Sequence, residues 1–161
     1  MKPPSSEMSC RVDDRQHRVA VDGPRLARAG DRALGALGRA GGAVEILVVD
    51  DHAIRDLNAR WRGIRRRTDV LAFPLETPGA PGGLVGQIVI SAQTAARQAR
   101  RVGVTLGDEL DLLATHGVLH LVGWDDRDPV EAGLMHERER EILSSGPRRP
   151  PPRLWKGLLH P

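Results

Sequence analysis

Two histidines four residues apart, followed by a glycine and a carboxylate, constrain this chain more than any other feature. Residues 115–126 read THGVLHLVGWDD. On a helix, side chains at i and i+4 share one face, so His116 and His120 can hold one divalent ion. Gly123 can end the helix and turn the chain, so that Asp126 returns as a third ligand. Three protein ligands with one open position are typical of a hydrolytic metal site rather than a structural one.

The composition fits one small domain without a membrane span. The chain has 161 residues, a mass of 17.5 kDa and 40% hydrophobic residues, enough for a single core. No apolar run approaches the roughly 18 residues that cross a bilayer, and the N-terminus lacks the apolar middle of a secretory signal. Cys10 is the only cysteine, so we expect no internal disulfide and no disulfide-linked partner. We expect a cytoplasmic protein, with Cys10 as an unremarkable thiol in a tail.

The distribution of arginines says more than the net charge. A net charge of +3 and a pI near 9.9 are a mild excess and no nucleic-acid signature alone. Arginines gather at residues 97–101 and 148–153, and a denser cluster comprises Arg60, Arg62, Arg65, Arg66 and Arg67. Guanidinium groups suit phosphate oxygens, while a solvated surface explains the clusters equally well. Aromatic residues are only 2%, which disfavours base stacking as a mode of RNA contact.

The order of apolar patterns predicts an α+β fold. Residues 1–16 are expected to be a disordered tail, residues 17–143 the domain, and residues 144–161 a flexible Pro/Arg-rich tail. Strand patterns occupy residues 17–22, 44–49, 68–73 and 84–90. Helical patterns occupy residues 24–40, a stretch after Asp50, and residues 91–101, 106–122 and 129–143. We therefore predict one domain with a mixed sheet of about four strands, packed with helices, and a metal site on a late helix.

The histidine pair needs more than its spacing to be meaningful. Six histidines in 161 residues give about 0.2 chance pairs at this spacing. However, the pair lies in the most apolar helix, where an unpartnered imidazole is costly to bury. Its Gly117 stands where H-E-x-x-H metalloproteases have a glutamate base, so the metal or another side chain must take the proton. Gly117 also lets another backbone approach the helix closely. The remaining histidines need no function: His17, His52, His136 and His160.

Three blocks of sequence together resemble a known family. The first is residues 116–125, HGVLHLVGWD. The second joins LNARWRG at residues 57–63 to TDVLAFP at 68–74, and the third is LVGQIVIS at 84–91. With Met135 in the last helix, these blocks resemble the YbeY family of rRNA maturation endoribonucleases, whose signature reads H-G-x-L-H-L-x-G-Y/W-D-H. The similarity covers roughly residues 43–143.

The resemblance implies a specific activity and site. Members have an α+β metal-hydrolase fold and bind one Zn²⁺ through three histidines of the signature. They act in the cytoplasm as single-strand-specific endoribonucleases, in 16S rRNA 3′-end maturation and ribosome quality control. Their partners are rRNA and the small ribosomal subunit, and no membrane is involved. By this resemblance His116 and His120 are the first two ligands, and Arg62 is the functionally important arginine.

The chain departs from the family at two positions. Asp126 stands where the family has its third histidine. Aspartate binds zinc at ordinary distances, but its negative charge makes the bound water less acidic and favours harder ions such as manganese. The predicted cofactor is therefore one Zn²⁺ per chain, with another divalent ion as the alternative. Gln87 stands where the family usually has aspartate, which could alter the groups around the ligands. Asp125 is close but matches a position that is not a ligand.

Together these features predict a metal-dependent, single-strand-specific endoribonuclease. The metal would lie at His116, His120 and Asp126, and Arg62 would neutralise the charge that builds on the scissile phosphate. The side chains of Arg65, Arg66 and Arg67 would follow the flanking RNA backbone. The general base is not evident, and Thr68-Asp69 suits a capping role better than catalysis. Two alternatives remain: a metal-dependent peptidase, and a ribosome-binding factor whose catalysis has lapsed.

Overall fold

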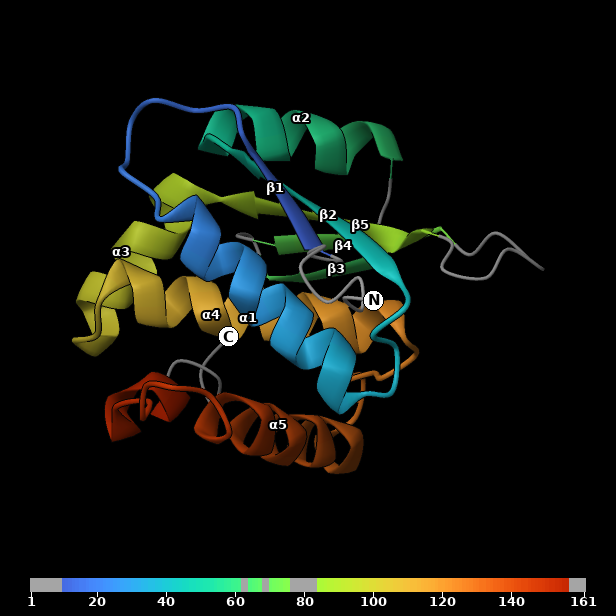
Figure 1. The fold of residues 1–161 in the computed structure, drawn as a ribbon. Coiled ribbons are helices and arrows are strands. Elements are labelled where there is room, and N and C mark those ends of the chain that lie inside the picture. The colour runs from blue at the N-terminus through green and yellow to red at the C-terminus, as the bar shows by residue number, and fades with distance from the viewer. Residues whose placement is uncertain (1–9, 62–63, 68–69, 76–83, 157–161) are drawn as a thin grey trace, which may run out of the picture.

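A mixed five-stranded sheet forms the centre of the molecule (Figure 1). A computed structural model describes residues 10–61, 64–67, 70–75 and 84–156. The strand order is β1-β2-β5-β4-β3, with β1, β2 and β5 parallel and β4 and β3 antiparallel to their neighbours. The strands are β1 (Cys10–Asp14), β2 (Ala43–Val49), β3 (Ile64–Arg67), β4 (Val70–Pro74) and β5 (Leu84–Ser91). The predicted single α+β domain with a mixed sheet is confirmed, and β3 is a strand that the sequence did not predict.

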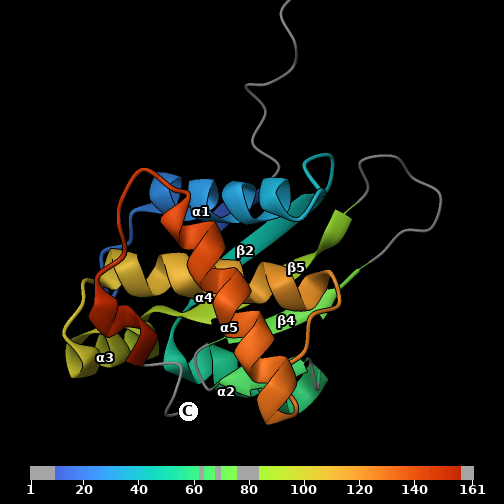
Figure 2. The ribbon, with the colours of Figure 1, turned by 90° about the horizontal axis from the view of Figure 1, so that it is seen from below.

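Helices cover both faces of the sheet, with more of them on one face than on the other. The helices are α1 (Gly23–Ala36), α2 (Asp51–Trp61), α3 (Ala92–Val102), α4 (Leu106–Leu121) and α5 (Pro129–Ser144). Helix α2 lies alone on one face, while α1, α3 and α4 cover the other (Figure 1). Helix α5 crosses α1 and α4 on the side away from the sheet (Figure 2). No helix of the described part of the chain is both long and apolar enough to cross a membrane.

Strand residues alternate between two cores because successive side chains point to opposite faces of a sheet. On β5, Ile88 and Ile90 belong to the large core under α1 and α4. Val89 between them joins the small core under α2, together with Leu47 of β2 and Leu71 of β4. Both faces of the central strands are thus buried, which explains their nearly continuous apolar sequences.

The first strand lies upstream of where the sequence predicted it. β1 pairs in parallel with β2, with Cys10 opposite Val44 and Val12 opposite Ile46. The expected strand at residues 17–22 is wrong, because Gln16 holds this stretch as a loop: it accepts from the N–H of Val19 at 2.9 Å and donates to the carbonyl of Val19 at 2.8 Å. The tail expected to reach residue 16 therefore contains part of the sheet.

Cys10 is a core residue rather than a tail thiol. Its side chain is 1% exposed and packs against Gly30 of α1, where any Cβ would overlap the sulfur. Its N–H donates to Asp31 Oδ1 at 2.8 Å, which ties β1 to α1. Burial, with a smaller contribution from the charge of Asp31, raises the pKa of the thiol to about 12.

The segment after α5 also packs onto the body. A short 3₁₀ helix, η1 (Pro152–Trp155), places Leu154 at 1% exposure against Leu112 of α4 and Leu143 of α5. The guanidinium of Arg140 lies 5.3 Å from the ring centroid of Trp155, within the range of a cation–π contact. The expectation of a flexible tail from residue 144 onward is therefore wrong for the described residues 144–156.

Helix α4 is the central element that carries the histidine pair. Thr105 caps it, accepting from the N–H of Asp108 at 3.1 Å, while the Asp108 carboxylate accepts from the N–H of Thr105 at 3.3 Å. This reciprocal capping box fixes where the helix begins. Gly117 faces β5, where a Cβ would lie 2.8 Å from Ile88 Cδ1. The glycine therefore permits the close approach of helix and sheet that the sequence indicated.

Candidate metal centre

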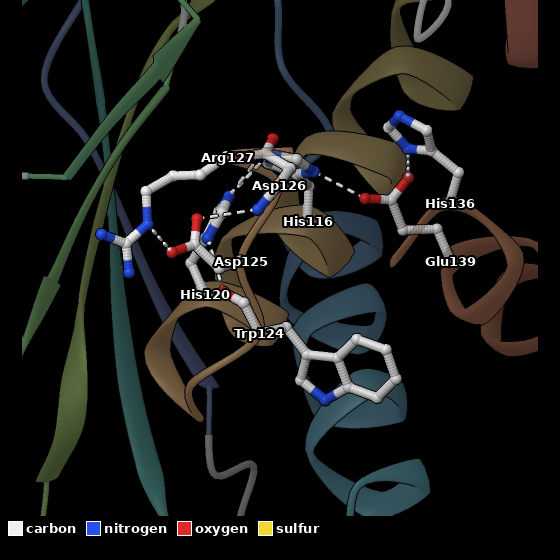
Figure 3. A network of polar contacts seen from close by, with 8 residues as sticks. All are labelled: His116, His120, Trp124, Asp125, Asp126, Arg127, His136 and Glu139. Atoms are coloured by element: carbon white, nitrogen blue, oxygen red, sulfur yellow. Dashed lines mark hydrogen bonds and ion pairs between the residues drawn. The ribbon is translucent and has the colours of Figure 1, made fainter. Parts of the chain in front are cut away.

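Helix α4 places both imidazoles of the pair in the interior on one side. His116 is 2% exposed and His120 is 3% exposed. Their Nε2 atoms lie 3.0 Å apart (Figure 3), as expected of side chains one helical turn apart. The two rings therefore present one nitrogen each to the same point in space.

The turn after α4 returns Asp126 to the histidines. Gly123 has φ of +106°, a conformation that glycine adopts without a steric penalty. The N–H of Gly123 bonds to the carbonyl of His120 at 3.1 Å and that of Trp124 to the carbonyl of Leu119 at 2.9 Å. These two bonds form a Schellman motif, which ends the helix at the predicted glycine. Asp126 Oδ2 then lies 3.7 Å from His116 Nε2 and 3.9 Å from His120 Nε2.

The neighbours of the other ring nitrogens fix the protonation of both imidazoles. His120 Nδ1 lies 2.9 Å from the carbonyl oxygen of Trp124, which can only accept, so this Nδ1 carries the proton. His116 Nδ1 lies 2.6 Å from Glu139 Oε1 and donates to that carboxylate in the same way. With its proton on Nδ1, each imidazole can offer its Nε2 lone pair to a metal.

The donor set fits a divalent cation. The two Nε2 atoms lie 3.0 Å apart, close enough to share a proton or to bind one metal ion between them. In a tetrahedral zinc site with bonds of about 2.0–2.1 Å, ligand atoms lie about 3.3 Å apart. The observed separations of 3.0, 3.7 and 3.9 Å bracket that value. His116, His120 and Asp126 are also the one such group of three ligand atoms within 4.8 Å found among the described residues.

Two residues of the network were missed by sequence reasoning. Glu139 of α5 is fully buried and accepts from His116, while His136 Nδ1 lies 3.3 Å from its second oxygen (Figure 3). Burial alone would raise the pKa of Glu139, but the hydrogen bonds from His116 and His136 outweigh it and lower the pKa. A signal was present in the sequence: Glu139 lies four residues after Met135 and three before Ile142, on the inward face of α5.

Asp125, the residue before Asp126, forms hydrogen bonds within the turn. Asp125 Oδ1 accepts from the N–H of Asp126 at 2.8 Å, and its other oxygen accepts from Arg127 Nε. These bonds engage Asp125 in shaping the turn that presents Asp126. That Asp125 is not a ligand stays a prediction.

Gln87 lies away from the metal ligands, and the predicted substrate-binding arginines lie wholly or partly outside the described residues. Gln87 donates to Glu45 Oε1 at 2.8 Å on the α2 face of the sheet, opposite the face that α4 covers. Arg62 lies outside the described residues, as do Thr68 and Asp69. The backbone of residues 65–67 lies in β3, but the side chains of Arg65, Arg66 and Arg67 are outside the description.

Known proteins resemble this chain over most of its length. The family described as Endoribonuclease YbeY matches residues 12–146. A protein named Endoribonuclease YbeY from Anaeromyxobacter sp. (strain Fw109-5) is 43% identical, over 84% of this chain and 70% of its own length. Those of Thermobifida fusca (strain YX) and Moorella thermoacetica are 44% and 40% identical, over 78% and 85% of this chain and 86% and 96% of their own lengths.

A solved structure shares the fold. The solution structure of TM1509 from Thermotoga maritima aligns with a TM-score of 0.57 at 23% identity, covering 91% of this chain and 89% of that one. The resemblance that the sequence motifs indicated is thus confirmed over 135 aligned residues and more. This chain belongs to the YbeY endoribonuclease family.

Proposed function

We propose that this chain is a metal-dependent endoribonuclease that cuts single-stranded RNA during 16S rRNA 3′-end maturation and ribosome quality control. Membership of a family whose curated relatives are named Endoribonuclease YbeY supports the activity. The observation that carries the metal dependence is the convergence of three ligand atoms within 4.8 Å, two of them on buried imidazoles. We further propose rRNA and the small ribosomal subunit as partners, and therefore the cytoplasm as the location.

His116, His120 and Asp126 would hold the ion. A divalent ion bound there supplies a Lewis acid for phosphate oxygens and an acidified water. The protein's own groups orient the ligands: the carbonyl of Trp124 holds His120 and the carboxylate of Glu139 holds His116. The burial of both rings excludes water from their flanks and strengthens each electrostatic contact.

Asp126 sets this site apart from the three-histidine pattern of the family. A carboxylate replaces a neutral imidazole, so the net charge of the loaded site falls by one. A site with a lower net positive charge would lower the pKa of a bound water less than a three-histidine site would. Zn²⁺, one per chain, is the ion we propose, and the added oxygen ligand makes Mn²⁺ the next candidate.

Four arginines in the segment 62–67 are proposed to contact the substrate. Arg62 would stabilise the charge that develops on the scissile phosphate, because guanidinium groups bind phosphate oxygens in a bidentate manner. Arg65, Arg66 and Arg67 would follow the flanking backbone of the RNA strand. Family membership and the density of arginine in this segment support these roles.

The deciding experiment measures metal content and RNA cleavage on the same preparations. Wild type should carry one divalent ion per chain by elemental mass spectrometry and should cut a single-stranded rRNA fragment. His116→Ala should lose both, whereas His52→Ala, an exposed histidine on α2, is the matched control and should keep both. Full cleavage by a metal-free His116→Ala protein would refute the proposal. Wild type without metal or cleavage would instead favour a ribosome-binding factor, and casein hydrolysis would favour a peptidase.

A further inference from the structure

A fully buried carboxylate on α5, that of Glu139, contacts the proposed ligand His116 but not His120. Glu139 has no exposed surface, and a buried carboxylate is costly unless it is paired and hydrogen-bonded. Its two oxygens face two imidazoles, at 2.6 Å from His116 Nδ1 and 3.3 Å from His136 Nδ1. Helix α5 thus contributes to the site without contributing a ligand (Figure 3).

We propose that Glu139 is a positioning residue that holds His116 with Nδ1 protonated and Nε2 aimed at the metal, while His136 anchors the second oxygen of Glu139. The inference deepens the proposed function and rests on it, since it assigns a role toward the same ion. The site then comprises the three ligands on α4 and its turn together with Glu139 and His136 on α5.

The two histidines of the pair differ in what holds them. His120 donates to a backbone carbonyl within its own turn, the oxygen of Trp124. His116 donates to a charged side chain 23 residues away in the sequence. A carboxylate raises the basicity of the ring it accepts from more than a neutral carbonyl does, so His116 becomes the stronger nitrogen donor of the two.

His136 explains how Glu139 keeps one orientation. Without a partner for its second oxygen, the carboxylate could rotate and break the 2.6 Å contact to His116. His136 lies one turn earlier on α5, with its side chain 20% exposed, and it contacts that oxygen at 3.3 Å. Its contact is the longer of the two, so we expect its removal to have the smaller effect.

The first test measures the tautomer of His116 in metal-free protein by ¹⁵N correlation spectroscopy. Wild type should show Nδ1 protonated, and Glu139→Gln should keep this form because its amide oxygen still accepts. Glu139→Leu removes the acceptor and should leave a mixture of tautomers. An unchanged tautomer in Glu139→Leu would overturn the inference. Because no metal is present, this result stands even if the proposed function fails.

The second test titrates Zn²⁺ against a competing chelator dye. Glu139→Gln should lower zinc affinity about tenfold and Glu139→Leu about 100-fold, the range expected for groups that orient a metal ligand. Glu137→Gln and Glu137→Leu change an exposed glutamate of the same helix and should stay within twofold of wild type. If Glu139→Leu does not fold, Glu139→Gln alone decides, and affinity within twofold of wild type would overturn the inference. Wild type that binds no Zn²⁺ would defeat the proposed function instead.

Discussion

The two ends of α4 use charged groups for opposite purposes. Near its start, Asp108 and Asp111 face Arg25 of α1, with Nη2 at 3.2 Å from Asp108 Oδ1 and 2.9 Å from Asp111 Oδ2. Near its end, His116 and His120 converge with Asp126. At the first end the chain brings its own cation, and the result is an ion pair that joins two helices. At the second end the groups that meet are all metal-ligand types, and the arrangement suits a cation from solution.

Removing His120 should have the largest effect on function. His120→Ala deletes one nitrogen ligand, and we expect a loss of at least about 100-fold in metal affinity together with RNA cleavage. The free energy of unfolding of the metal-free protein should fall by about 2–3 kcal/mol, because a buried ring is truncated and its hydrogen bond to the Trp124 carbonyl is lost. Chelator titration and urea denaturation measure the two. A variant that unfolds before it can be assayed would contradict the division between the two ends.

Removing Arg25 should lower the stability of the fold and leave metal binding intact. Arg25→Leu leaves two carboxylates without their guanidinium, and we expect a loss of roughly 1–3 kcal/mol in the free energy of unfolding. The metal affinity should remain within twofold of wild type. Arg28→Leu, which changes an exposed arginine one turn along α1, is the control and should change stability little. Lost metal binding in a folded Arg25→Leu protein would show that the two ends are coupled.

The pH dependence of Arg25→Leu sharpens the comparison further. Burial raises the pKa of Asp111, and Arg25 offsets only part of that effect. A carboxyl whose folded pKa lies above its unfolded value holds its proton more tightly when folded, so stability falls as pH rises through the folded pKa. Without Arg25 this pKa rises further. The stability deficit of Arg25→Leu relative to wild type should therefore shrink as the pH is lowered from 7 toward 5, as urea denaturation at several pH values can check.

Changing the third ligand should have the smallest effect. Asp126→His restores the family pattern, and we expect zinc affinity at or above that of wild type and within about tenfold of it. Preference for Zn²⁺ over Mn²⁺ should increase, which competition titration measures. If neither Asp126→His nor Asp126→Ala changes metal affinity, Asp126 is not a ligand.

What the sequence predicted about the site depended on short distances along the chain. His116 and His120 follow from helical periodicity, and Gly123 ends the helix as a glycine with positive φ does. Glu139 was missed because its partner is 23 residues away, and only the packing of α5 on α4 brings them together. Arg62 stays a prediction that rests on family resemblance.

The strands show the same division. The pattern at residues 44–49 and 84–90 identified β2 and β5, because both faces of these strands are buried and their sequences are almost wholly apolar. β1 has only Cys10 and Val12 as apolar residues, and a sheet edge needs few. Pattern alone therefore favoured the alternation at residues 17–22, which instead packs Val19 and Val21 on the core as a loop.

Because Cys10 is buried, the native thiol should not interfere with labelling at cysteines introduced elsewhere. Its thiol is sealed between β1 and α1, and at ordinary pH almost none of it is in the reactive thiolate form. A cysteine introduced on the surface would then be the one site that maleimide reagents modify quickly. Fluorophores or spin labels can thus be attached at a cysteine introduced near the ligand turn or on α5 without first removing Cys10.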